Sequence, residues 1–197
     1  MCTDFMLPKS TGKLISGRTM DFFLEPTWQL AAIPAGTTFT AVKPLKSSRS
    51  PLSWTAKYPL IGIGVKSKAQ ASNLRLTDAM NTKGFSGAML WLPGSEYPGV
   101  KDAPGTAQLL SAFDIVVWAV SSFASVAALK KGLALVSSDK AGKTASLWIW
   151  DPAQSGSRTD GTFQNAAPLH FQFHDNTGAS LVVEFRNGKM EITNNDT

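Results

Sequence analysis

The only cysteine of the chain is its second residue, and this position allows a chemistry that an internal cysteine lacks. Removal of Met1 would make Cys2 the N-terminal residue, and cysteine is small enough to permit that removal. The freed α-amino group would titrate at a pKa of about 7.7–8.0, so it can take the thiol proton directly or through a water molecule. Cys2 would then combine a nucleophile and a base in one residue, without a histidine partner.

An arginine and an aspartate are expected beside this cysteine. Residues 2–7 and 14–22 have strand-like composition and flank a Pro-Lys-Ser-Thr-Gly turn, which predicts a β-hairpin. Its symmetry places Cys2 opposite position 20, next to Arg18 and Asp21. Arg18 would lower the pKa of the thiol, and Asp21 would hold the α-amino group. The alternative is a buried structural cysteine near a surface ion pair, but the position at residue 2 favours the nucleophile.

Two blocks of the sequence resemble the choloylglycine hydrolase family of N-terminal nucleophile hydrolases, which includes bile salt hydrolases and penicillin V acylases. The first block is Met1-Cys-Thr with Gly17-Arg-Thr-Met-Asp21. The second is Thr77-Asp-Ala-Met-Asn-Thr-Lys-Gly-Phe85, which runs into Met89-Leu-Trp-Leu-Pro-Gly94. Residues 53–58 and 173–189 are also similar to the family, whereas residues 140–167 diverge from it.

The resemblance implies a role for each matching residue. Cys2 matches the nucleophile, and Arg18 and Asp21 match the two residues that attend it. Trp91 stands where the family offers a backbone N–H to the oxyanion of the tetrahedral intermediate. The implied activity is hydrolysis of a linear, non-peptide amide, with penicillin V or a conjugated bile salt as the type of substrate. No cofactor or metal is expected.

Three further residues are candidates near the site. In the family the loop after the catalytic hairpin borders the acyl pocket, so Phe23 and Trp28 are candidates to bind an apolar acyl group. Both could equally be core aromatics. Asn81 precedes Gly84 by three residues and has the character of a turn residue, so we expect it to be structural and not catalytic.

Two site residues of the family have no counterpart in this sequence. In relatives an asparagine that completes the oxyanion hole follows the strand matching residues 188–193, and an arginine comes later. The sequence ends at Thr197, before either position. We therefore expect residues 1–197 to be one incomplete domain, inactive and poorly soluble by itself, that self-associates or pairs with a C-terminal segment. The alternative is a non-catalytic fragment or binding subunit that retains the fold.

The apolar patterns predict an α+β fold, matching the αββα sandwich that the resemblance implies. Apolar residues between 109 and 120 recur at three- and four-residue spacing, which predicts a helix. Ser122 or Ser125 would cap a second helix that runs through Lys131 and ends at Gly132. Short strands are predicted at residues 28–33, 53–58 paired with 60–65, 87–92, 133–137, 147–150, 169–174, 181–186 and 189–193. Asn187-Gly188 predicts a tight hairpin turn.

Composition and charge indicate which classes of binding partner to expect. The chain has 197 residues, of which 43% are hydrophobic and 17% charged, as in a globular domain that contacts neither membrane nor nucleic acid. Seven of the basic residues behind the net charge of +5 lie between positions 26 and 77, without an acidic residue among them. They are scattered among Pro and Ser turns and lack interleaved aromatics, so we expect them to form a solvated face and not a nucleic-acid site. The expected partner is a small amide substrate.

Two remaining inferences concern metal binding and location. His170 and His174 share one face of a strand, but without a third histidine and with a distant cysteine they do not favour a metal site. The sequence shows neither a basic segment followed by an apolar run nor a membrane span, which indicates a cytoplasmic protein. The alternative is a periplasmic protein, because many Gram-negative relatives expose the cysteine by signal cleavage.

Overall fold

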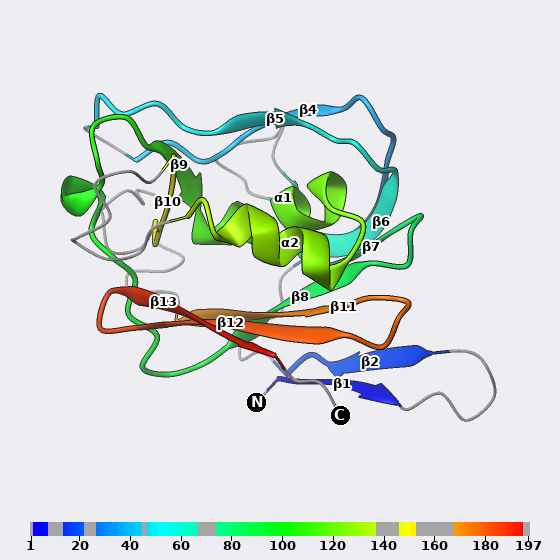
Figure 1. Cartoon of the computed structure of the whole chain (residues 1–197). Coiled ribbons are helices and arrows are strands. Elements are labelled where there is room, and N and C mark those ends of the chain that lie inside the picture. Colours follow the sequence, from blue (N-terminus) through cyan, green and yellow to red (C-terminus); the bar gives the residue numbers. More distant parts are fainter. Residues whose placement is uncertain are drawn as a thin grey trace.

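A seven-stranded antiparallel sheet is the centre of the computed structural model, which describes residues 2–7, 14–21, 27–44, 47–66, 74–136, 146–152 and 168–194. The strand order is β13–β12–β11–β8–β7–β6–β3 (Figure 1). The strands are β3 (Trp28–Ile33), β6 (Leu60–Lys66), β7 (Leu74–Asn81), β8 (Ser86–Trp91), β11 (Leu169–His174), β12 (Ser180–Arg186) and β13 (Lys189–Asn194). None of the helices in the described ranges is long and apolar enough to cross a membrane.

Different elements pack on the two faces of this sheet. Helices α1 (Ile115–Ser122) and α2 (Val126–Leu133) lie on one face, and the hairpin of β1 (Thr3–Leu7) and β2 (Ile15–Thr19) lies on the other (Figure 1). Because side chains alternate along a strand, Phe173 packs into the core under the helices while its neighbour His174 faces the hairpin. The predicted α+β class is therefore confirmed, with a helical layer and a strand layer on opposite faces of one sheet.

The predicted register of the N-terminal hairpin is confirmed. Thr3 pairs with Thr19 and Leu7 pairs with Ile15, which is the pairing that the sequence symmetry requires. Along β1 the exposed residues alternate with half-buried ones, and the half-buried residues face the sheet. This register sets Asp4 directly opposite Arg18, so both side chains point toward the seven-stranded sheet.

The helical layer forms where the sequence predicted helices, with changed ends. Ser125 caps α2, because its Oγ accepts a hydrogen bond from the Ala128 N–H at 3.2 Å. The helix continues to Leu133 and does not end at Gly132. A Cβ at Gly132 would lie 2.4 Å from the Phe123 ring, so this glycine serves close packing within the helix and not its termination.

Residues 109–111 form a strand, and the prediction of a helix there was wrong. Strand β9 (Gln108–Ser111) pairs in parallel with β10 (Leu147–Trp150), and η2 (Ala112–Asp114) then leads into α1. Leu110 belongs to the main core, whereas Leu109 packs with the two tryptophans of β10 in a second cluster. A strand that is apolar on both faces gives the same composition as a buried helix, which explains the error.

Two other strand predictions were wrong. In the segment predicted at 133–137, residues 133–136 are the end of α2 and a turn, with a single bridge between Val136 and Leu147, and residue 137 lies outside the described residues. Residues 53–58 do not pair with 60–65, because β5 (Ser53–Thr55) pairs with β4 (Thr38–Thr40) and β6 pairs with β3 and β7. After β5 ends, the N–H groups of Lys57 and Tyr58 donate to the Ser121 carbonyl.

The other predicted strands appear as β3, β8, β10, β11, β12 and β13, with ends within one residue. The turn at Asn187-Gly188 is also confirmed. Both residues have a positive φ, 51° and 72°, which is the left-handed geometry of a two-residue hairpin turn. A short helical turn, η1 (Val100–Asp102), lies between β8 and β9.

A buried carboxyl group joins the helical layer to the loop after β4, and it leads to the first testable prediction. Burial raises the pKa of Asp114 to about 6, although the Val42 N–H donates to its Oδ2 at 2.8 Å and Arg75 attracts it. Since the folded protein binds this proton more tightly than the unfolded chain does, the stabilisation is present below pH 4 and is lost as the pH rises through 6.

We therefore expect Asp114→Asn, which cannot ionise, to gain stability relative to the wild type as the pH rises from 4 to 7. A shift of two pKa units corresponds to about 3 kcal/mol, which is an upper bound for this gain. Urea unfolding of both proteins at several pH values measures the difference. A difference in unfolding free energy that stays constant over this pH range would contradict the assignment.

Candidate active site

Cys2 lies at the start of β1, where three groups converge on its thiol. The sulfur is 3.7 Å from the Asp21 carbonyl oxygen, and it is also reached by the Arg18 side chain and the Trp91 backbone. Burial alone would raise the pKa of this thiol. Contacts with the Asp21 backbone, Arg18 and the Trp91 backbone outweigh burial and hold the pKa below its ordinary value. The site therefore favours a thiolate.

Arg18 crosses from the hairpin to the central sheet, where it is held by several acceptors. Its guanidinium forms an ion pair with Asp78, which lies on β7. It also donates to the Thr77 carbonyl at 3.3 Å and to the Met89 carbonyl at 2.6 Å. Burial alone would lower the pKa of Arg18, but Asp78 and Cys2 raise it, so the group stays cationic. The thiol thus has a fixed positive charge beside it.

Asp78 was not singled out in the sequence, although it stands in the Thr77–Phe85 block. A signal was available, because an aspartate inside an apolar strand usually has a buried cationic partner. Which cation it would bind could not be read from the sequence, since Arg18 lies 60 residues earlier on a separate hairpin.

Asp21 follows β2 and is fully exposed. The N-terminal ammonium holds the pKa of its carboxyl below the ordinary value, by hydrogen bonding and by charge attraction. This ammonium belongs to Met1 and not to Cys2. Whether Asp21 holds the amine of Cys2 stays a prediction, because that amine exists only after Met1 is removed.

Trp91 ends β8, where its backbone pairs with Leu169 of β11. Its indole packs against the main core, on the helix-covered face of the sheet. The Trp91 backbone, and not the ring, reaches Cys2. The role of the Trp91 N–H as a donor to the oxyanion stays a prediction.

Of the remaining predicted residues, Trp28 and Asn81 lie away from the thiol. Phe23 lies outside the described residues. Trp28 begins β3 on the hairpin side of the sheet, and it pairs with Val65, which in turn pairs with Arg75. It is thus at the same end of the sheet as Trp91, and three strand spacings separate the two, roughly 14 Å. Its side chain is 37% exposed, so it is free to meet an apolar group there.

Asn81 is buried at the turn between β7 and β8, and it acts as a structural connector. Its side-chain NH₂ donates to the carbonyls of Val120 and Phe123 at 2.8 and 2.7 Å. Its Oδ1 accepts from the N–H groups of Lys83 and Phe85. The side chain therefore ties this turn to α1 and has no group left for a substrate.

A family model described as linear amide C–N hydrolases, choloylglycine hydrolase family, matches residues 2–197. The chain belongs to this family. Curated relatives include the bile salt hydrolase/transferase of Clostridium perfringens, 28% identical over 196 residues, and the penicillin V acylase of Pectobacterium atrosepticum, 26% identical over 197 residues. These matches cover 100% and 97% of this chain but only 51% and 46% of the relatives, so the chain spans about half their length.

A solved structure of this choloylglycine hydrolase family has the same fold. A mutant of the conjugated bile acid hydrolase of Clostridium perfringens superposes with a TM-score of 0.72 at 25% identity, over 100% of this chain and 51% of that one. The penicillin V acylase of Agrobacterium tumefaciens shares the fold with a TM-score of 0.69 at 21% identity. The expected N-terminal nucleophile hydrolase architecture is thereby confirmed for the part of the fold that this chain covers.

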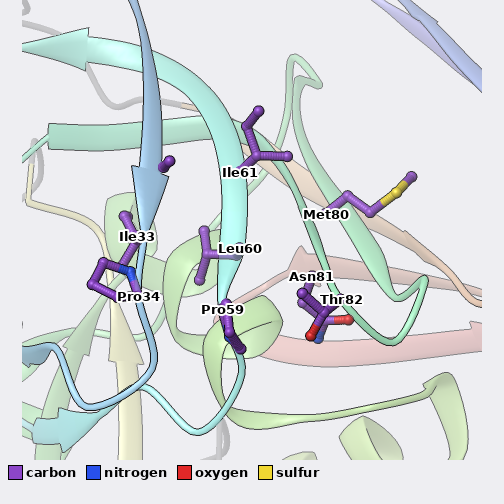
Figure 2. Close-up of a pocket in the computed structure, with 9 residues that line it drawn as sticks. Ile33, Pro34, Pro59, Leu60, Ile61, Met80, Asn81 and Thr82 are labelled. Atoms are coloured by element: carbon purple, nitrogen blue, oxygen red, sulfur yellow. The ribbon is translucent and has the colours of Figure 1, made fainter.

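The chain also has an apolar pocket of about 500 Å³ at the far end of its sheet (Figure 2). Its lining includes Pro34, Pro59, Ile61, Met80 and Thr82. Met80 is two residues beyond Asp78 along β7, roughly 7 Å at the rise of a strand, in the direction away from Trp91, and Thr82 follows the end of that strand. This pocket is therefore separate from the groups around Cys2.

Two further observations concern charged side chains. Among the residues that the structure describes, no three His, Cys, Asp or Glu side chains form a group that could hold a metal ion. The basic stretch is not uniformly a solvated face, since Arg49 donates to the carbonyls of Ala103 and Pro104. Arg75 likewise stacks on the Phe113 ring at 4.7 Å.

Proposed function

We propose that Cys2, exposed by removal of Met1, is the nucleophile of a hydrolase that cleaves a linear, non-peptide amide C–N bond. One observation carries the proposal: the thiol has a lowered pKa between the fixed Arg18 cation and the Trp91 backbone. Membership of the choloylglycine hydrolase family supports this class of reaction. Penicillin V and conjugated bile salts are the substrate types to test, because the relatives named above are a penicillin V acylase and bile salt hydrolases.

The reaction follows from the positions of these groups. The Cys2 thiolate attacks the amide carbonyl carbon, and the α-amino group holds the thiol proton. As the carbonyl oxygen becomes negative, it accepts a hydrogen bond from the Trp91 N–H, a donor of a kind typically worth about 3 to 4 kcal/mol. The C–N bond then breaks, and the amine leaves with the proton from the α-amino group. Water, deprotonated by the same amine, hydrolyses the thioester and regenerates the thiol.

Asp78 has an indirect part in this scheme. It neutralises the Arg18 guanidinium while directing it, so that a cation can remain partly buried beside the thiol. The side chains of the pair are 11% and 24% exposed, which limits competition from water. The role of Asp78 is to position Arg18, and it does not touch the reacting atoms.

A second candidate function is a non-catalytic subunit that binds another polypeptide. It is favoured by large apolar side chains on the hairpin side of the sheet that nothing in the described structure covers. Leu30 is 74% exposed, Ile61 50% and Met80 45%, and they lie side by side on β3, β6 and β7. Contiguous exposed apolar residues mark interaction surfaces more often than free surface.

The experiment that tests both functions assays penicillin V and conjugated bile salts with two preparations. One is the 197-residue chain alone, and the other is the chain co-expressed with a C-terminal segment of the length that relatives carry beyond it. We expect the chain alone to be inactive and to aggregate in light scattering, because the apolar face is open, and the co-expressed pair to be monodisperse and active.

The possible results distinguish the hydrolase from the binding subunit. Turnover by the pair, lost in the chain alone, supports the hydrolase. A stable but inactive pair with an intact Cys2 thiol supports the binding subunit. A monodisperse chain that turns over substrate by itself would contradict the expected dependence on a second segment while supporting the hydrolase.

A further inference from the structure

Three polar side chains from three strands meet beneath the hairpin, in what we call the Asp4–His174–Ser180 array. His174 Nε2 lies 3.3 Å from Asp4 Oδ2, and His174 Nδ1 lies 2.7 Å from Ser180 Oγ. The Asp4 and His174 side chains are 6% and 5% exposed, and Ser180 is 3% exposed. The array therefore joins β1 of the hairpin to β11 and β12 of the central sheet in a nearly dry environment.

The contacts of the histidine ring differ on its two sides. His174 Nε2 faces the Asp4 carboxylate at ion-pair distance without a hydrogen bond between them, so the two groups attract each other when the imidazole is protonated. His174 Nδ1 and the Ser180 hydroxyl share a hydrogen bond, in which the donor depends on the tautomer of the ring. Ser180 is also the backbone partner of His174 in the register of β11 and β12, which fixes the hydroxyl at the ring.

The order of these groups is that of a hydrolase triad, but their burial excludes that role. A nucleophilic serine must meet a substrate carbonyl, and Ser180 lies below the hairpin with 3% of its surface exposed. A buried ion pair and hydrogen bond of this kind instead fix the relative position of the elements that carry them.

The element fixed here carries the nucleophile. Asp4 is two residues from Cys2 on β1, so both side chains point to the same face of the strand. Asp4 is also the direct cross-strand partner of Arg18. Any shift of Asp4 relative to the sheet therefore moves the thiol and the guanidinium together, away from the Trp91 backbone and from Asp78.

We propose that the Asp4–His174–Ser180 array is a buried latch that holds the Cys2 strand against the sheet, which makes Asp4 and His174 positioning residues for the thiol. Arg18, which reaches β7 and β8, and the Trp91 backbone at Cys2 also attach this part of the chain to the sheet. The array fastens the hairpin to β11, on the opposite side of β8 from β7. The effect on turnover rests on the proposed function, whereas the effect on the thiol does not.

The test measures how fast iodoacetamide alkylates the thiol as a function of pH, a signal that comes from Cys2 alone because the chain has one cysteine. We expect Asp4→Ala and His174→Ala to raise the pH midpoint of alkylation by about one unit, toward that of a free thiol. His174→Gln, whose amide can donate to Asp4, restores most of the wild-type midpoint. A merely structural role would not move this midpoint in a variant that remains folded.

Asp114→Ala is the matched control, since it removes a buried carboxyl group from the helical side of the sheet and should leave the midpoint unchanged. Wild-type midpoints in folded Asp4→Ala and His174→Ala would overturn the proposal. If those two variants do not fold, Ser180→Ala decides: it keeps the Asp4 contact but frees the ring, so an intermediate midpoint supports the latch and an unchanged midpoint overturns it. Assaying amide turnover of the same proteins co-expressed with the C-terminal segment separates the two proposals, because a shifted midpoint in a series whose wild type has no amidase activity supports the latch and contradicts the hydrolase.

Discussion

Cys2→Ala is expected to abolish amide hydrolysis in a preparation in which the wild-type protein turns over substrate. The alanine side chain has no lone pair to attack the carbonyl carbon, and no other cysteine exists in the chain to replace it. Cys2→Ser is expected to leave a small residual activity at most, because a hydroxyl is far less ionised than a thiol in the same field of Arg18. Steady-state kinetics with penicillin V and with a conjugated bile salt measure both effects.

The controls for this experiment come from the site itself. The Arg18–Asp78 ion pair and the Trp91 backbone do not depend on the sulfur, so both variants should fold and melt like the wild type. Unchanged turnover in a folded Cys2→Ala protein would remove Cys2 from the mechanism. Full activity in Cys2→Ser would show that the reaction does not depend on the lowered pKa of the Cys2 thiol.

Blocking the α-amino group of Cys2 is expected to have the second largest effect. The mechanism assigns this amine two proton transfers, and general acid–base catalysis typically contributes about 10²- to 10⁴-fold. We therefore expect a protein that retains Met1, or any N-terminal extension, to lose activity by a factor in this range. The experiment releases the chain from a removable N-terminal fusion partner so that it begins at Cys2, and compares turnover before and after release.

Intact mass must accompany each rate, because a trace of processed protein would mimic activity in the blocked form. Alkylation of the thiol by iodoacetamide serves as a check on the blocked form, since Arg18 and the Trp91 backbone lower the thiol pKa while Met1 is in place and the thiol should still react. A fully active preparation with Met1 retained would contradict the N-terminal nucleophile mechanism.

The register of the N-terminal hairpin could be predicted from local sequence pattern alone. A single turn between two short strands fixes the register, and the register then places Cys2, Arg18 and Asp21 together without any knowledge of the fold. The caps and tight turns at Ser125 and at Asn187-Gly188 were predictable for the same reason, because their hydrogen bonds and backbone angles involve neighbours in sequence.

Prediction failed where an apolar pattern had two structural explanations. Residues 109–111 lie between two cores, so Leu109 and Leu110 are both buried although they point in opposite directions. A strand buried on both faces and a buried helix are not distinguished by hydrophobicity alone. The partner strand β10 begins 36 residues after β9 ends, so the sequence near residue 109 does not indicate this pairing.

The sequence by itself predicted Cys2 as the nucleophile, its hairpin, the two charged residues beside it and the family, because each depends on neighbours or on short motifs. Only the tertiary structure decided which groups surround Cys2 and Arg18. Asp78 meets Arg18 across 60 residues, the Trp91 backbone reaches Cys2 across 89, and His174 lies beside Asp4 across 170. Burial gives these contacts their strength, and burial is a property of the packed layers and not of any single segment.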